Sequence, residues 1–297
     1  MIHFLASLIT CIVSYCLFPA SLTLSNLVGA IDYPNKRSSH SSPTARGGGF
    51  MFFLAFSLCL IIFPINLNLK LSLLLSGTFI FLVGFLDDAI NIFPFMKLSG
   101  QFLALAIYHF ISEFLGYNIP IYIDIAIALW IIFITNATNI IDGLDGLAGG
   151  VCASESLCLC IVALAFGEMD ITICSFFLLA AIVGFLPHNF PKAKIFMGDC
   201  GALFLGFSLS ILSARLIVES QSTIYLLSTI LIFLVPIYDT SFSIFRRLIK
   251  KQNPFKADKK HFHHMLLQHG FTKECASLLL ITISLLFGLF GIVISSI

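Results

Sequence analysis

Long apolar runs alternate with short polar connectors along the entire chain. A transmembrane helix needs about 20 mostly apolar residues, and runs of this kind occur at ten places. They lie near residues 3–25, 48–65, 69–87, 100–116, 119–136, 150–167, 170–187, 200–218, 222–241 and 276–296. No long repeat is present and no soluble domain is appended. The pattern therefore predicts a single all-α domain over residues 1–297, a polytopic bundle of about ten transmembrane helices.

The composition agrees with a membrane protein and excludes several other classes. Hydrophobic residues make up 59% of the chain and charged residues 10%, whereas soluble domains average about 45–50% and about 25%. So few charges cannot cover a water-exposed surface, which excludes a soluble globular enzyme and a disordered chain. The formal net charge of +1 provides no field for a polyanion, so a nucleic-acid partner is not expected.

The cysteines and the first residues have simple interpretations. The nine cysteines are odd in number, contain no CxxC pair and lie mostly in apolar runs. We interpret them as free, small buried hydrophobes rather than as disulfides or metal ligands. Residues 1–24 lack a basic start and are apolar over a long stretch for a signal peptide. They are expected to form a retained first membrane helix.

The distribution of basic residues predicts an orientation. Ten spans place both termini on one side of the membrane, and the connectors alternate between two faces. Fourteen of the 16 Lys and Arg residues fall in connectors 26–47, 88–99, 137–149, 188–199 and 242–275. The positive-inside rule puts these connectors in the cytoplasm and both termini on the extracytoplasmic side.

Acidic and imidazole groups gather on or at the edge of the same predicted face. Acidic residues contribute little to topology, so orientation does not explain their position. A transporter would instead place ionisable groups near the membrane midplane. We therefore expect an active site at the cytoplasmic face. The groups are Asp32, Asp87, Asp88, Asp142, Asp145, Asp199, Asp239 and Asp258, with His40, His188, His261, His263, His264 and His269.

Two of these carboxylates are adjacent at the end of an apolar run. Asp87 and Asp88 repel each other and are costly to desolvate, which a hard cation such as Mg²⁺ or a bound proton would relieve. A solvated helix end is the alternative. Downstream, Lys97 could meet a phosphate or extend to the membrane interface. Asp199 precedes another apolar helix, where it could either cap that helix or bind Mg²⁺ beside a phosphate.

The densest polar pattern has a three-residue spacing. Asn136, Asn139, Asp142 and Asp145 recur every three residues, which on a helix places them near one face. The intervening Gly143 allows close approach of a ligand or of another segment. A polar stripe at a membrane boundary needs a ligand or metal to satisfy it. A capped helix end followed by a turn is the alternative.

The last and first polar connectors carry further candidates. His261, His263 and His264 lie in the most basic connector, which contains 8 of the 16 Lys and Arg residues. No cysteine spacing supports structural zinc, so these imidazoles, with Arg246 nearby, favour an anion site for a diphosphate. In the first connector the polar residues are Asp32, Arg37, His40 and Arg46, followed by three glycines whose N–H groups could approach a phosphate.

Together, these motifs resemble those of the polyprenyl-phosphate N-acetylhexosamine-1-phosphate transferases, most closely the bacterial undecaprenyl-phosphate N-acetylglucosamine-1-phosphate transferases. The resemblance extends from about residue 30 to about residue 275, with the motifs in the expected order. The motifs are Asp32-x-Pro34-x-x-Arg37-x-x-His40, Gly84-Phe85-Leu86-Asp87-Asp88, Asn136-x-x-Asn139-x-x-Asp142-Gly-Leu-Asp145, Phe196-Met-Gly-Asp199, Pro236-Ile-Tyr-Asp239, Arg246-Arg247 and His261-x-His263-His264.

The resemblance implies a reaction and a setting. A UDP-N-acetylhexosamine, most simply the N-acetylglucosamine compound, donates its sugar 1-phosphate to undecaprenyl phosphate, with Mg²⁺, and UMP leaves. The aspartates, which lack thiolate partners, suit hard cations and make Mn²⁺ a possible substitute. This is the first step of a lipid-linked cell-envelope glycan at the cytoplasmic face of a bacterial inner or plasma membrane. Membrane lipids are implied partners, and self-association into a homo-oligomer is left open. One departure is that a single apolar span follows the histidine connector, whereas some members carry more.

The resemblance also implies roles for the candidate residues. Asp87 and Asp88 match positions assigned to metal binding or acceptor activation, and Asp199 matches a Mg²⁺ ligand. The expected catalytic residues are Asp87, Asp88, Asp142 and Asp145. The expected metal ligands are Asp199, Asp87 and Asp142. The expected substrate-binding residues are Asp32, Arg37, His40, Lys97, Asn136, Asn139, Arg246, His261, His263 and His264.

Two other functions stay open from the sequence. One is the sister reaction, transfer of phospho-N-acetylmuramoyl-pentapeptide to the same lipid; the basic residues around the histidines favour the N-acetylglucosamine reaction. The other is a non-catalytic lipid-linked sugar transporter or scaffold, which would release no UMP. The aspartates on one predicted face favour an enzyme.

Overall fold

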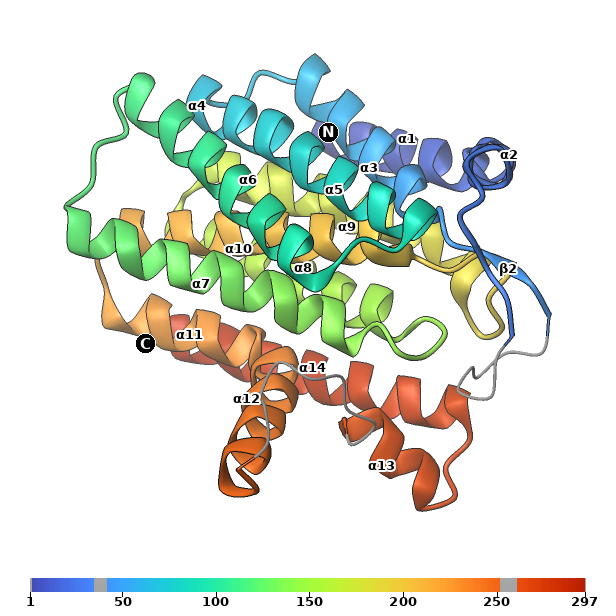
Figure 1. Ribbon diagram of the computed structural model, residues 1–297. Coiled ribbons are helices and arrows are strands. Elements are labelled where there is room, and N and C mark those ends of the chain that lie inside the picture. Colours follow the sequence, from blue (N-terminus) through green and yellow to red (C-terminus); the bar gives the residue numbers. More distant parts are fainter. Residues whose placement is uncertain (1, 35–41, 252–260, 297) are drawn as a thin grey trace.

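The computed structural model describes residues 2–34, 42–251 and 261–296. Apart from one pair of two-residue strands, the regular elements of these ranges are helical (Figure 1). The prediction of an all-α bundle is therefore confirmed. The N-terminal helices are α1 Ile2–Cys16, α2 Phe18–Val28, α3 Gly49–Ile62, α4 Leu67–Leu71, the π-helical turn Ser72–Ser76, α5 Gly77–Ile90 and α6 Pro94–Phe114. The others are α7 Ile121–Ile141, α8 Leu147–Phe166, α9 Met169–Asn189, α10 Gly198–Ser220, α11 Thr223–Ile232, α12 Leu234–Ile249, α13 Phe262–Gln268 and α14 Lys273–Ser295.

Helical segments lie at all ten predicted positions, but they differ in length and polarity. Six are long and apolar enough to cross a membrane, or up to eight if each bent pair forms one span. The pairs are α1 with α2, bent by 44°, and α11 with α12, bent by 76°. Of the two remaining segments, α3 has 14 residues, and α6 begins at Pro94, earlier than predicted, and carries several polar side chains.

The strongest departure from the predicted spans is the break between α11 and α12. The sequence predicts one span over 222–241, whereas α11 ends at Ile232 and α12 leaves the bundle at a steep angle (Figure 1). Pro236 explains the position of the break. Proline lacks an N–H and its ring clashes with the carbonyl four residues earlier, which belongs to Ile232.

Helix α10 forms the centre of the bundle, and all its residues from Cys200 to Leu216 are buried. Glycines let neighbouring helices approach it closely. A Cβ atom at Gly84 of α5 would lie 2.5 Å from Cys200 Cα, and one at Gly49 of α3 would lie 2.5 Å from Gly201 Cα. The beginning of α10 is therefore held between α3 and α5. On the outside of the bundle, many large apolar side chains are exposed, as expected for a surface in contact with lipid.

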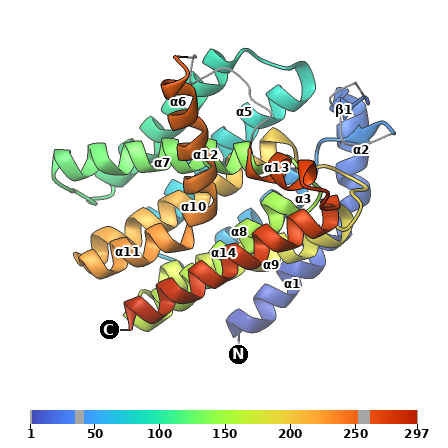
Figure 2. The same cartoon turned by 90° about the horizontal axis from the view of Figure 1, so that it is seen from below.

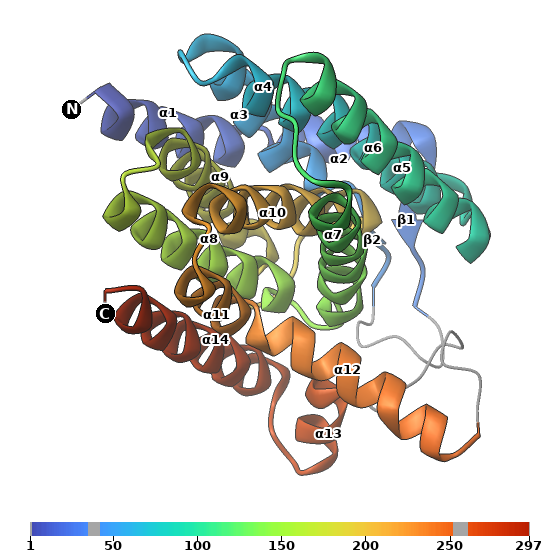
Figure 3. The ribbon, with the colours of Figure 1, turned by 90° about the vertical axis from the view of Figure 1, so that its left-hand side faces the viewer.

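The two ends of the bundle have different contents. Both termini lie at one end, and the strands and α13 lie at the other (Figures 2 and 3). Since the helices alternate in direction, this second end also holds the connections α5–α6, α7–α8 and α9–α10. Strands β1 Ile31–Asp32 and β2 Thr44–Ala45 are antiparallel, with Asp32 opposite Thr44. Thus the connectors predicted to carry the active site meet at one end.

Candidate active site

The two adjacent aspartates of α5 have different surroundings. Asp88 Oδ1 accepts a hydrogen bond from the Asp199 N–H at 2.8 Å, and Asp88 Oδ2 accepts one from the Cys200 N–H at 2.9 Å. These N–H groups belong to the first turn of α10, which has no intrahelical acceptor for them. Asp88 is 4% exposed. Its carboxylate therefore caps α10 and fixes the position of Asp199.

Asp87 faces a different group, the ammonium of Lys97. Lys97 Nζ pairs with Asp87 Oδ2 and lies 3.0 Å from Asp199 Oδ2. The other oxygen of Asp199 accepts a hydrogen bond from Asn139 Nδ2. We call Asp87, Lys97, Asn139 and Asp199 the Lys97 cluster. Its members come from α5, α6, α7 and α10, and the structure brings together four residues that the sequence analysis had singled out separately.

Asn136 lies one turn before Asn139 but has other partners. Its Nδ2 donates to Gln101 Oε1 at 2.6 Å, and its Oδ1 accepts from Gln101 Nε2 at 3.1 Å. This reciprocal amide pair links α6 to α7. Because both amide groups are satisfied by each other, Asn136 positions the helices around the Lys97 cluster rather than offering a free group to a ligand.

Asp142 ends α7 and has no such partner. None of the described residues forms a hydrogen bond with its carboxylate. Burial, together with the nearby carboxylates of Asp199 and Asp145, raises the pKa of Asp142 to about 7, although Arg46 opposes the rise. A carboxylate in this position lacks a neutralising group, and a bound cation would supply one.

The residues after Asp142 connect two of the predicted motifs. A Cβ atom at Gly143 would lie 2.3 Å from His263 Nε2, so the absence of a side chain lets the histidine ring lie against this turn. Further on, Asp145 Oδ2 accepts a hydrogen bond from the Ala193 N–H at 3.1 Å. The α7–α8 connection is thus held between α13 and the α9–α10 connection.

The histidines of the last connector are anchored by Asp239. Asp239 Oδ2 lies 2.9 Å from His261 Nδ1, and Asp239 Oδ1 accepts a hydrogen bond from the Phe262 N–H at 2.6 Å. His263 stacks with His261 at 5.9 Å and contacts His264 at 4.2 Å between ring centroids. Burial, with the adjacent His264, lowers the pKa of His263 to about 4. At neutral pH it is therefore an uncharged donor or acceptor.

The first connector reaches the same end of the bundle. Arg46 Nη2 donates to Asp32 Oδ2 at 2.9 Å. Burial opposes the charge of Arg46, but the carboxylates of Asp32, Asp88 and Asp199 raise its pKa. The N–H of Gly48 donates to the Phe196 carbonyl at 2.9 Å, which docks this connector on the segment before α10.

Three of the predicted residues, Arg37, His40 and Asp258, lie outside the described residues. Arg246 lies on the protruding α12, where its Nη2 donates to Ser243 Oγ at 3.3 Å and its guanidinium lies 5.6 Å from the Phe242 ring.

The site meets the requirements of a metal ion only in part. Within the described ranges, no three His, Cys, Asp or Glu side chains are close enough together to hold one. Instead, Lys97 neutralises Asp87 and Asp199. The chemistry of the donors nevertheless suits a hard cation, because the carboxylates of Asp87, Asp142 and Asp199 are oxygen ligands. The residues thus match Mg²⁺ in type, without a closed coordination shell.

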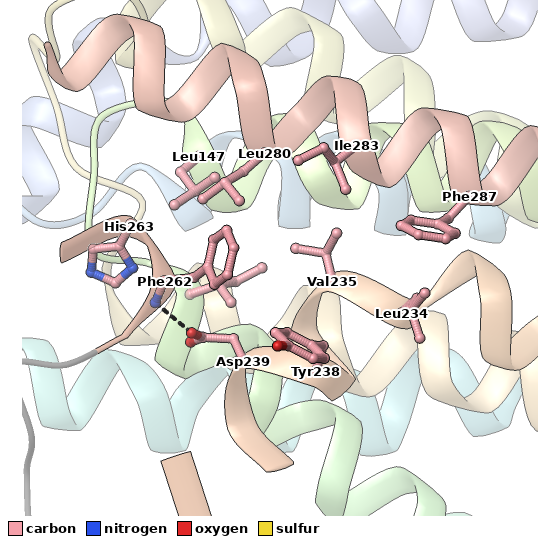
Figure 4. A pocket seen from close by; sticks show the side chains of 11 residues that line it. Leu147, Leu234, Val235, Tyr238, Asp239, Phe262, His263, Leu280, Ile283 and Phe287 are labelled. Carbon is pink, nitrogen blue, oxygen red and sulfur yellow. Dashed lines mark hydrogen bonds between the residues drawn. The ribbon is translucent and has the colours of Figure 1, made fainter. Parts of the chain in front are cut away.

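An apolar cavity of about 260 Å³ opens beside the histidines, between α12 and α14. Asp239 and His263 lie toward one end of it, and Leu234 and Phe287 lie toward the other (Figure 4). The lining between them is almost entirely apolar. The cavity therefore combines a polar end next to the candidate site with a long apolar wall. Its other labelled lining residues are Leu147, Val235, Tyr238, Phe262, Leu280 and Ile283.

Comparisons with known proteins agree with this arrangement. A probable undecaprenyl-phosphate N-acetylglucosaminyl 1-phosphate transferase of Bacillus subtilis is 33% identical, covering 100% of this chain and 85% of the relative. The sequence profile of glycosyl transferase family 4 matches residues 70–217. The chain belongs to glycosyl transferase family 4. The resemblance to polyprenyl-phosphate sugar-1-phosphate transferases, predicted from the motifs, is confirmed.

Two further relatives have related names. The undecaprenyl-phosphate alpha-N-acetylglucosaminyl 1-phosphate transferase of Thermotoga maritima is 31% identical, covering 95% of this chain and 87% of the relative. The decaprenyl-phosphate N-acetylglucosaminephosphotransferase of Mycolicibacterium smegmatis is 30% identical, covering 85% and 72%. The family 4 profile match includes the whole Lys97 cluster and Asp142, but not Arg46, His261, His263 or His264.

Sequence reasoning missed three residues that organise the site. Arg46 was noted only as the residue before a glycine run, although it forms an ion pair with Asp32. Asp239 was seen in a motif but given no role; an ionisable residue within an apolar run was the available signal. Gln101 gave no signal beyond its polarity, because its partner Asn136 is 35 positions away.

Proposed function

We propose that this chain transfers N-acetylglucosamine 1-phosphate from UDP-N-acetylglucosamine to undecaprenyl phosphate. An oxygen of the acceptor phosphate forms a bond to the phosphorus that carries the sugar. The bond from that phosphorus to the UMP oxygen breaks, and UMP leaves with the electron pair. The products are undecaprenyl diphosphate N-acetylglucosamine and UMP.

The observation that carries this proposal is the Lys97 cluster. It places one ammonium between two carboxylates, at the end of the bundle that holds the strands and α13. Phosphoryl transfer depends mainly on positioning and on neutralising negative charge. Lys97 is suited to hold a phosphate of the acceptor or donor, with Arg46 as a second cation nearby.

Mg²⁺ is the proposed cofactor, and Mn²⁺ is the proposed substitute. Asp199, Asp87 and Asp142 would hold it, in agreement with their oxygen donors. When bound, it would neutralise phosphate oxygens and polarise the phosphorus that is attacked. Asp88 is better suited to positioning than to direct chemistry, because both of its oxygens accept N–H groups of α10.

The apolar cavity suits the acceptor's isoprenoid chain. Its apolar wall offers burial to hydrocarbon, while its polar end at His263 lies next to the Asp142–Gly143 turn. An acceptor placed along α12 would therefore bring its phosphate toward the site while its chain remained among apolar side chains.

For the topology, we propose ten membrane passes, with the active-site connectors in the cytoplasm and both termini outside. The 14 to 2 distribution of Lys and Arg supports this orientation. A bilayer somewhat thinner near α3 and a polar contact surface along α6 would accommodate these two less typical segments.

The decisive experiment measures UMP release by the purified protein in detergent with undecaprenyl phosphate, Mg²⁺ and UDP-N-acetylglucosamine. We expect turnover that stops in excess EDTA and returns with Mg²⁺ or Mn²⁺. UDP-N-acetylgalactosamine and UDP-N-acetylmuramoyl-pentapeptide serve as competing donors. Preference for the pentapeptide donor would favour the sister reaction, and no UMP release with any donor would favour the transporter.

A substitution tests the role of Asp199. We expect Asp199→Asn to lower turnover about a hundredfold or more, since it removes an anionic oxygen ligand proposed to hold Mg²⁺ beside the reacting phosphates. The control is Glu113→Gln, an exposed acid at the opposite end of the bundle, which should leave turnover unchanged. Near-normal turnover of Asp199→Asn would show that the assignment to this residue is wrong.

A further inference from the structure

A second polar cavity lies at the end of the bundle opposite the candidate active site. Its volume is about 300 Å³. Its walls come from the α3–α4, α6–α7 and α8–α9 connections and from the last turns of α10. Neither the transfer reaction nor its substrates use this region.

A buried arginine forms one wall of this cavity. Arg215 of α10 is 5% exposed. Its Nε donates to the Tyr108 hydroxyl at 3.2 Å, and its Nη2 donates to Ser112 Oγ at 2.9 Å and to Asn68 Oδ1. Its guanidinium also lies 3.5 Å from the centre of the Tyr117 ring.

These contacts involve Nε and Nη2 of Arg215 and leave its Nη1 group without a described acceptor. All the hydrogen-bond acceptors are uncharged groups, and none of the described carboxylates forms an ion pair with Arg215. A buried cation is costly unless its donors are satisfied. An anionic group that enters the cavity would accept a hydrogen bond from Nη1 of Arg215.

Three carboxylates also line the cavity. They belong to Glu168 and Asp170 at the start of α9 and to Glu219 near the end of α10. Burial raises the pKa of Glu168, and the carboxylates of Glu219 and Asp170 raise it further. The three groups therefore repel one another in the absence of a cation. They are too far apart to hold a metal ion together, because the described residues contain no such group. An organic ammonium has the longer reach that this spacing needs.

We propose that this cavity binds a phosphoethanolamine group, with its phosphate at Arg215 Nη1 and its ammonium among Glu168, Asp170 and Glu219. One buried cation and three carboxylates in one cavity match a zwitterion better than either ion alone. Arginine is well suited to phosphate oxygens. The cavity lies at helix ends, and the exposed Phe114 directly precedes its lining residue Leu115, as is typical of the depth where aromatic residues meet lipid headgroups.

Native mass spectrometry of the delipidated protein in detergent tests this proposal. The probes are phosphatidylethanolamine and phosphatidylglycerol, which share a phosphate and differ in the ammonium. We expect the wild-type protein to retain phosphatidylethanolamine at least about fivefold better. The double variant Asp170→Asn, Glu219→Gln should lose this preference. Glu113→Gln, which removes an exposed acid outside the cavity lining, should keep it.

Further measurements separate the alternatives. If free phosphoethanolamine displaces the bound lipid, the site accepts the head group from a soluble source as well. If the lipid is retained in the presence of free phosphoethanolamine, the site takes its ligand from the membrane. A melting curve monitors folding, and the single variant Glu219→Gln, at an exposed position, replaces the double variant if that one unfolds. Equal retention of both lipids by the wild type would overturn the proposal. Loss of the phosphatidylethanolamine preference in the Glu113→Gln control as well would also overturn it. So would stoichiometric Ca²⁺ in the wild-type protein that disappears in the double variant.

Discussion

Asp87 and Asp88 show how far the surroundings of a residue determine its role. The Asp88 carboxylate accepts two N–H groups of α10, whereas Asp87 faces the Lys97 ammonium. Helix geometry turns adjacent side chains by about 100°, so one residue points at the neighbouring helix and the other points toward the cluster. The pair therefore divides into a residue that positions α10 and a residue of the Lys97 cluster.

This difference between Asp87 and Asp88 predicts that the two Asp→Asn substitutions affect stability and turnover differently. Asp88→Asn leaves one α10 N–H group without an acceptor and should destabilise the protein by about 1–3 kcal/mol, lowering both its Tm and its turnover. Asp87→Asn should keep the wild-type Tm and lower turnover about a hundredfold. Melting curves and UMP release from the same preparations make the comparison. The same fall in Tm for both variants would contradict it.

His263 predicts a pH dependence of stability. Its folded-state pKa of about 4 lies below the unfolded value of about 6.5, so the unfolded chain binds the extra proton between these values. The stabilisation is complete above about pH 6.5 and is lost as the pH falls toward about 4. Between pH 7.5 and 5.0 the loss should be about 2 kcal/mol. His263→Gln should reduce the corresponding fall in Tm, and equal falls in both proteins would show that the ring is not held neutral.

At the scale of elements, close helix contacts determine where the charged groups lie. Gly84 and Asp88 are one turn apart on α5, and both contact the start of α10. A side chain at Gly84 would meet backbone atoms of Asp199 and Cys200. The distance between α5 and α10 therefore sets the geometry of the Lys97 cluster.

Substitutions at two glycines of α5 test this relation. Gly84→Ala should separate the helices, cost about 1–3 kcal/mol and reduce turnover. Gly77→Ala is the control on the same helix, because its Cβ atom would meet only the Phe204 ring, at 3.2 Å, which is a side chain that can shift. Melting curves and turnover of both variants provide the measurement. A Gly84→Ala protein that matches the wild type would mean that this contact does not position the site.

The sequence predicted the elements better than their contacts. Apolar run length was enough to find the helices, and Pro236, visible in the sequence, accounts for the break that the run-length criterion overlooked. The three-residue spacing placed Asn136 and Asn139 near one face. It could not show that Asn136 pairs with Gln101 while Asn139 reaches Asp199, since the latter pair is 60 positions apart. Such choices depend on how helices pack, which local patterns do not encode.

At the scale of the whole molecule, the two ends of the bundle carry different chemistry. The end with the strands and α13 collects the Lys97 cluster and the histidines, whereas the other end holds Arg215 and its carboxylates. Helix α10 extends between them, with Asp199 in its first turn and Arg215 near its end. The proposed orientation assigns these ends to opposite faces of the membrane.

Single cysteines in a protein without its native cysteines test this orientation. Ser42 and Asn118 are exposed and lie in connectors at opposite ends. In intact cells, Asn118→Cys should react with an impermeant maleimide, and Ser42→Cys should react only after permeabilisation. Each variant is the control for the other. The reverse labelling pattern would place the candidate active site outside the cytoplasm.

The cavity between α12 and α14 has a consequence for how substrate is supplied. An acceptor that enters between these helices stays in the bilayer and arrives by diffusion in two dimensions. Its effective concentration is then its mole fraction among the surrounding lipids, and the volume of the solution does not matter. In mixed micelles, diluting undecaprenyl phosphate with inert detergent should therefore slow the reaction at constant bulk concentration, whereas diluting the micelles with buffer at constant UDP-sugar should not.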